Sequence, residues 1–148
     1  MPDVMTGGCA CGQVRFTAQI ANDEAYLCHC RMCQRATGSV SIAFKNVKQA
    51  DVSWENGPDW YDSSPIATRP YCSTCGTSLG FKFKDGSTNM DLTVASFDDP
   101  TPFVPKHHFG AESMLRAWLN TEGLPEKRTT DYQPLVNMWV DKAGQVPE

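Results

Sequence analysis

The chain of 148 residues lacks several features that would assign it to a common protein class. It contains no run of basic residues and its formal net charge is −4, so we expect no nucleic-acid partner. It has no apolar segment long enough to span a bilayer, so we expect no membrane partner. Its first residues, MPDVMTGGCACG, have neither the basic start nor the apolar stretch of a signal peptide, which predicts a cytoplasmic protein.

The sequence also lacks internal repeats and low-complexity linkers, and its length is ordinary for one domain with one core. Apolar residues alternate with polar ones in several segments, and this alternation predicts half-buried strands. Asp-Gly in 84–89 predicts a hairpin loop, and Gly38 predicts the end of a short helix. We therefore expect a mainly β fold with strands at 13–20, 39–45, 77–84 and 89–96, short helices at 31–37 and 111–119, and an ambiguous segment at 134–140.

All seven cysteines fall into three clusters, 8-GCACG-12, 28-CHCRMC-33 and 72-CSTCG-76. An odd number of cysteines in a reducing compartment argues against a disulfide framework and favours metal or redox chemistry. Cysteines two or three residues apart have the spacing of zinc ligands, because both sulfurs can reach one ion. A redox role for 72-CSTC-75 is the alternative, but the sequence shows no βαβ unit of the thioredoxin type around it.

The number of cysteines predicts two metal sites, a closed one with four protein ligands and an open one with three. A structural zinc ion takes four protein ligands, and the two pairs supply four sulfurs: Cys9, Cys11, Cys72 and Cys75. This site would link two points of the chain about sixty residues apart. The remaining cluster supplies only three sulfurs, and three protein ligands with an exchangeable fourth are typical of catalytic zinc. We refer to Cys28, Cys30 and Cys33 as the triplet.

His29 is the obvious candidate for a fourth ligand of the triplet, but its position argues against that role. In extended backbone Cys28 and Cys30 point to one side and His29 to the other. We therefore expect His29 to act as an acid, a base or a hydrogen-bond partner, or to have a supporting role only. A second structural site, completed by another protein ligand, is the alternative interpretation of the triplet.

The cysteine motifs identify a family resemblance. The order Gly-x-Cys-x-Cys-Gly, Cys-His-Cys-x-x-Cys and Cys-x-x-Cys-Gly resembles the glutathione-dependent formaldehyde-activating enzyme family, which includes centromere protein V. The segments 99-DPTPFVPKHHF-109 and 118-WLNTEGLP-125 are similar to its C-terminal half. The resemblance implies a single zinc-binding domain over 1–148, with a motif-bearing core at about 7–125 and a tail at 126–148. It also implies a β-tent fold, in which small antiparallel sheets surround zinc.

The resemblance further implies a reaction. The two cysteine pairs would hold a structural zinc ion and the triplet a catalytic one, so that each chain carries two. At the catalytic ion the thiol of glutathione would add to formaldehyde and give S-hydroxymethylglutathione. We therefore expect a zinc-dependent carbon–sulfur lyase whose partners are a small thiol and a small aldehyde. A zinc-stabilised binding module without catalysis is the alternative, and a homodimer is compatible with the sequence.

Charged residues near the triplet are candidates for substrate binding. Zinc with three thiolates carries a net negative charge, and Arg31 and Arg35 flank the triplet. We expect these two arginines, with Lys106 as a third candidate, to offset that charge or to bind the carboxylates of glutathione. A solvated helix face is the alternative interpretation of Arg31 and Arg35. His108, in preference to His107, is our candidate for a proton-transfer group.

Overall fold

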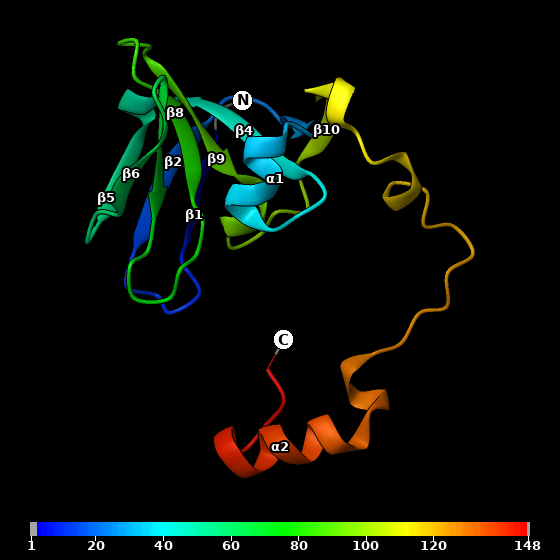
Figure 1. Cartoon of the computed structure of the whole chain (residues 1–148). Coiled ribbons are helices and arrows are strands. Elements are labelled where there is room, and N and C mark those ends of the chain that lie inside the picture. The colour runs from blue at the N-terminus through cyan, green and yellow to red at the C-terminus, as the bar shows by residue number, and fades with distance from the viewer. Residues whose placement is uncertain (1–2, 148) are drawn as a thin grey trace. The chain divides into compact units, whose positions relative to one another are not determined.

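The computed structural model describes residues 3–147, which form two compact units divided between Leu115 and Arg116. In the part of the chain that the structure describes, ten strands, all in the first unit, form two sheets. Figure 1 labels most of these strands. The smaller sheet has the order β1-β2-β5, with β1 at Asp3–Gly8, β2 at Arg15–Ile20 and β5 at Val52–Glu55. The mainly β fold predicted from the sequence is therefore confirmed.

The larger sheet has seven strands in the order β10-β3-β4-β9-β8-β7-β6. In chain order the strands are β3 (Glu24–Cys28), β4 (Ile42–Lys48), β6 (Asp59–Ser64), β7 (Ala67–Tyr71), β8 (Gly80–Phe83), β9 (Asn89–Thr93) and β10 (Val104–Phe109). The predicted hairpin loop at 84–89 joins β8 to β9, which are antiparallel. The predicted strand at 89–96 is shorter than expected, because its last three residues form a 3₁₀ turn, η2 (Val94–Ser96).

One strand pair departs from the expected antiparallel arrangement. β10 runs parallel to β3 along the edge of the larger sheet, and their register shifts between Pro105 and His108. A proline lacks the backbone N–H that a regular ladder requires, so an irregularity at this point has a physical cause. The pairing brings His108 opposite Leu27 and Phe109 opposite Cys28. It therefore places the end of β10 beside the beginning of the triplet.

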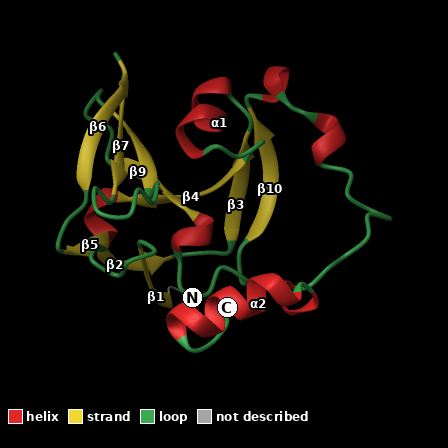
Figure 2. Ribbon diagram, turned by 60° about the horizontal axis from the view of Figure 1, so that its bottom comes forward, coloured by secondary structure: helices red, strands yellow, loops and turns green. Residues whose placement is uncertain are grey.

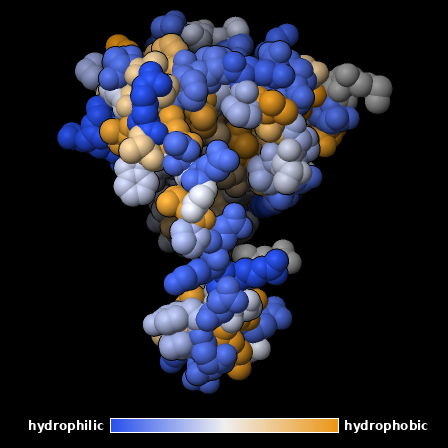
Figure 3. Space-filling model, turned by 90° about the vertical axis from the view of Figure 1, so that its right-hand side faces the viewer, coloured by the Kyte–Doolittle hydropathy of each residue, from blue (hydrophilic) through white to orange (hydrophobic). Residues whose placement is uncertain are grey.

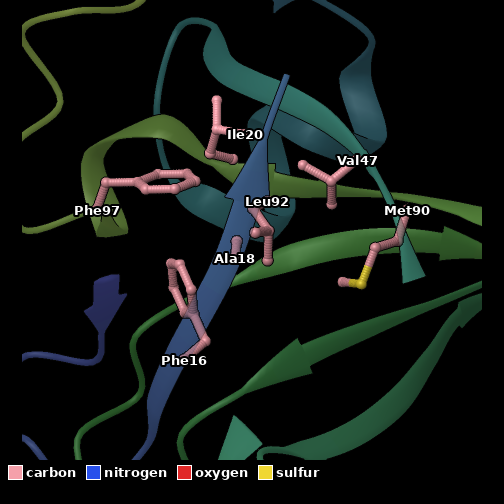
Figure 4. Close-up of a cluster of buried hydrophobic side chains, with 7 residues drawn as sticks. All are labelled: Phe16, Ala18, Ile20, Val47, Met90, Leu92 and Phe97. Carbon is pink, nitrogen blue, oxygen red and sulfur yellow. The ribbon is translucent and has the colours of Figure 1, made fainter. Parts of the chain in front are cut away.

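A hydrophobic core lies where the two sheets face each other. Alternate residues of β2 (Phe16, Ala18 and Ile20) are buried, as the sequence pattern predicted. They pack with four further buried side chains, Val47, Met90, Leu92 and Phe97 (Figure 4). The phenyl rings of Phe16 and Phe97 meet edge to face, with centroids 5.1 Å apart. This core fixes β2 against β4 and β9, and β4 adjoins the strand that carries Cys28.

The predicted helix at 31–37 is confirmed as α1 (Arg31–Thr37), which lies against β4 (Figure 2). It ends at Gly38, whose φ of 71° is in the left-handed region that glycine adopts readily. The ambiguous segment is a helix, α2 (Gln133–Ala143), in the second unit. The segment 111–119 forms two 3₁₀ turns, η3 (Ala111–Ser113) and η4 (Arg116–Trp118), because Met114 between them is extended.

Two short 3₁₀ turns complete the secondary structure, η1 (Gln49–Asp51) and η5 (Thr129–Asp131). On the face drawn in Figure 3, hydrophilic residues predominate and hydrophobic residues form small groups between them. Within residues 3–147 none of the helices has the length and apolar character needed to cross a membrane.

Candidate metal centres and the adjoining cavity

The two cysteine pairs form one group of four sulfurs. Their Sγ atoms all lie within 4.8 Å of one another, and Cys11 Sγ is 3.5 Å from Cys9 Sγ and 3.7 Å from Cys72 Sγ. The first pair follows β1 and the second follows β7, so two turns far apart in the sequence supply the group. Cys9 and Cys72 are buried, whereas Cys11 and Cys75 are exposed.

The turns that carry these pairs have the backbone geometry that a metal-binding turn requires. Gly76 has a φ of 79° and donates its backbone N–H to the carbonyl of Cys72 at 2.7 Å. The backbone N–H of Ala10 donates to Thr77 Oγ1 at 3.0 Å and so joins the two turns. The Thr77 side chain and backbone, which hydrogen-bond to Cys75, lower the pKa of its thiol to about 5. Since cysteine binds a metal ion as the thiolate, a lowered thiol pKa suits a metal site.

The triplet forms a second group, whose three sulfurs also lie within 4.8 Å of one another. Cys28 ends β3, Cys30 is the N-cap of α1, and Cys33 lies in the first turn of that helix. The backbone N–H of Cys33 donates to Cys30 Sγ at 3.3 Å, so the cap itself positions a sulfur. Among residues 3–147 no fourth His, Cys, Asp or Glu side chain completes this group.

The cation beside the triplet is Arg69 of β7, which the sequence analysis did not identify. Its Nη2 donates to Cys33 Sγ at 3.4 Å, and its side chain is only 1% exposed. Hydrogen bonds from Cys28 and then from Arg69 lower the pKa of Cys33. A buried arginine requires a nearby negative charge, and the local sequence of β7 does not show that Arg69 lies beside the triplet.

Both sulfur groups fit zinc by the chemistry of their donors. Four thiolates close a structural site, whereas three leave one position for another ligand. Three thiolates with a divalent cation carry a net charge of about −1. The positive charge of Arg69 offsets this negative charge. The attraction explains why the guanidinium is buried although its Nε and Nη1 have no hydrogen-bond partner among the described residues. The triplet and Arg69 therefore complement each other electrostatically.

The three histidines lie close to the triplet but in different environments. His29 is completely buried, and its Nε2 shares a hydrogen bond of 2.8 Å with Nδ1 of His108. His29 does not belong to the sulfur group. The imidazole of His107 stacks on the ring of Tyr26, with centroids 5.0 Å apart, and lines a cavity. His108, our sequence-based candidate for proton transfer, is not among the described residues that line it.

The three cations proposed from the sequence are exposed. Arg31 lies at the start of α1 and donates from Nη1 to Gln34 Oε1 at 2.6 Å, and Arg35 lies in the last turn. Neither contributes to the cavity beside the triplet, and Lys106 lines a different, smaller one. Their roles in substrate binding stay predictions.

A cavity of about 450 Å³ adjoins the triplet. All three sulfur-bearing residues line it, together with Arg69 and His107. A pocket of this size, with a few polar groups among apolar ones, is typical of a small-molecule site. The arrangement therefore brings a candidate metal position, a cation and an imidazole to one apolar cavity.

Comparisons with known proteins agree with these features. The model of the glutathione-dependent formaldehyde-activating enzyme family matches residues 4–113. An uncharacterized lyase of Schizosaccharomyces pombe (strain 972) is 32% identical over 80 residues, which is 54% of this chain and 58% of that protein. The crystal structure of a Rhodobacter sphaeroides protein shares the fold, with a TM-score of 0.56 and 21% identity over 70% of this chain and 99% of its own. The family match spans most of the chain and contains every cysteine, so the chain belongs to the glutathione-dependent formaldehyde-activating enzyme family.

Proposed function

We propose that the protein is a zinc-dependent carbon–sulfur lyase that forms or breaks a thiol–aldehyde adduct at the triplet. The observation that supports it best is the difference between the two sulfur groups. Four sulfurs meet where two turns join, whereas three sulfurs meet in the wall of a cavity. The family and the lyase of fission yeast support the same reaction class.

The side chains around the cavity have distinct roles in this proposal. Cys28, Cys30 and Cys33 would hold a zinc ion, which when bound lowers the pKa of a thiol at its fourth position. Arg69 offsets the negative charge that thiolates accumulate beside it. In the forward direction the S–H bond is broken, the C–S bond forms, and the carbonyl π electrons move to oxygen, which takes up a proton. The reverse reaction breaks the C–S bond, and neither direction needs an oxidant or a reductant.

We assign the proton transfer to His107, since its imidazole lies in the cavity wall. The hydrogen bond between His29 and His108 ties the start of the triplet segment to β10. In this proposal it positions His107 and does not act on substrate directly. Glutathione is the proposed thiol, and the exposed Arg31 and Arg35 on α1 are the proposed contacts of its carboxylates.

The proposed reaction is tested by adduct exchange. Zinc-loaded protein should accelerate the exchange between glutathione, formaldehyde and their adduct by at least about tenfold over buffer, as measured by NMR exchange spectroscopy. Removal of zinc with a chelator should abolish the acceleration, and added zinc should restore it. Exchange at the buffer rate in zinc-loaded protein would contradict the proposal for this pair of substrates. Ligand binding without exchange would favour a zinc-stabilised binding module.

A further inference from the structure

Several aromatic rings that contact one another form part of the wall of the cavity beside the triplet. The ring of Phe44 lies 5.9 Å from that of Tyr26 and 6.4 Å from that of Phe81, between centroids. Phe81 in turn meets Phe83 edge to face at 4.9 Å. These rings come from β3, β4 and β8 of the larger sheet, in which β9 lies between β4 and β8, so the sheet itself builds an apolar wall.

Large apolar side chains also remain exposed where they line this cavity. Ile66, in the turn between β6 and β7, is 61% exposed, and Phe109 at the end of β10 is 62% exposed. Met32 of α1 and Phe83 of β8 are about half exposed as well. Exposed apolar side chains gathered around one cavity indicate a ligand that covers apolar surface.

The two charged side chains of the cavity each have a protein contact, although Arg69 Nε and Nη1 have no hydrogen-bond partner among the described residues. Arg69 contacts Cys33 Sγ, and its guanidinium lies 4.9 Å above the centroid of Phe81. Asp91 is buried and accepts a hydrogen bond from Asn46 Nδ2 at 3.1 Å. No other Lys, Arg, Asp or Glu is among the described lining residues. The two carboxylates of glutathione would therefore find inside the cavity only Arg69, whose charge already offsets that of the triplet, and burying them there would cost free energy.

Formaldehyde alone would leave most of the cavity unfilled. The cavity volume of about 450 Å³ is in the range of sites for drug-sized molecules. A one-carbon aldehyde would fill little of it and would leave the aromatic wall in contact with water. Neither glutathione nor formaldehyde therefore matches the space beside the triplet.

We propose that this cavity binds the apolar substituent of the aldehyde, an aromatic ring or a branched aliphatic group, and that the preferred substrate is larger than formaldehyde. The inference rests on the proposed function, because it specifies one of the two reactants. Glutathione would then extend along the exposed face of α1, outside the cavity.

The test uses zinc-loaded full-length protein and two cavity variants, Ile66→Trp, which fills the mouth, and Phe83→Asp, which places a charge there. Both positions are exposed, so we expect folded proteins. Val4→Trp and Val4→Asp, at an exposed position on β1, are the matched controls. Benzyl alcohol, an unreactive analogue of benzaldehyde, is the binding probe. We expect both cavity variants to raise its Kd at least about tenfold and the controls to leave it unchanged.

The same proteins are then assayed with benzaldehyde and with formaldehyde. Comparing each variant with wild type removes the difference in intrinsic reactivity between the aldehydes. We expect Ile66→Trp to lower kcat/KM for benzaldehyde at least about tenfold more than for formaldehyde. Binding of the probe that neither variant weakens, or equal losses for the two aldehydes, would overturn the inference alone. Variant-sensitive binding with no reaction of any aldehyde would overturn the proposed reaction and, with it, the assignment of the cavity to the aldehyde.

Discussion

Replacing Cys75 by serine is expected to unfold the protein, although the side chain is exposed. A serine at this position loses no packing, so any large effect must come from the fourth sulfur of the closed group. Metal binding at a structural site contributes directly to folding free energy, and this site joins segments 61 residues apart. We expect the midpoint of thermal unfolding, measured by circular dichroism, to fall by roughly 20 °C or more.

Ser73→Ala is the matched control, because it changes an exposed residue in the same turn without removing a sulfur. Its unfolding midpoint should stay within a few degrees of wild type, roughly 3 °C. A stable Cys75→Ser protein that retains its zinc would show that the four sulfurs do not form the structural centre.

Replacing Cys30 by serine is expected to have the opposite result, loss of function with the fold retained. Cys30 caps α1 by accepting a hydrogen bond from the backbone N–H of Cys33. Serine is among the preferred N-cap residues, so the helix keeps its cap while the triplet loses a ligand. We expect one zinc ion per chain, thiol–aldehyde exchange at least about 100-fold slower, and an unfolding midpoint lowered by roughly 5 °C.

Ala36→Ser serves as the control, since it adds a serine to α1 without removing a sulfur. It should retain both zinc ions and the exchange rate. If Cys30→Ser unfolds the chain as completely as Cys75→Ser, the division into a structural and a catalytic centre is wrong.

The sequence predicted well those features that depend on local patterns. Alternation identified β2, and Gly38 marked the end of α1, because both features depend on residues close together in the chain. The assignment of four cysteines to one group needed only their number and spacing, and the structure gathers those four sulfurs.

The features that the sequence did not predict depend on contacts between distant segments. Arg69 is 36 residues from Cys33, and nothing in the flanking sequence of the triplet indicates the contact. His107 and His108 are adjacent in the sequence, so their flanking residues do not distinguish them. The irregular parallel pairing of β10 with β3 determines which of the two side chains lines the cavity. The aromatic wall likewise requires the order of strands in the larger sheet, which local alternation does not specify.

The central claim is that the triplet holds zinc with a fourth position open to a substrate thiol. X-ray absorption at the zinc edge of the metal-loaded protein tests it directly, because it counts sulfur neighbours. Seven cysteine sulfurs shared by two ions give an average of about 3.5 sulfurs per zinc, which should rise to about 4 when glutathione is added. A sulfur count that glutathione leaves unchanged, or a single zinc ion per chain, would contradict the claim.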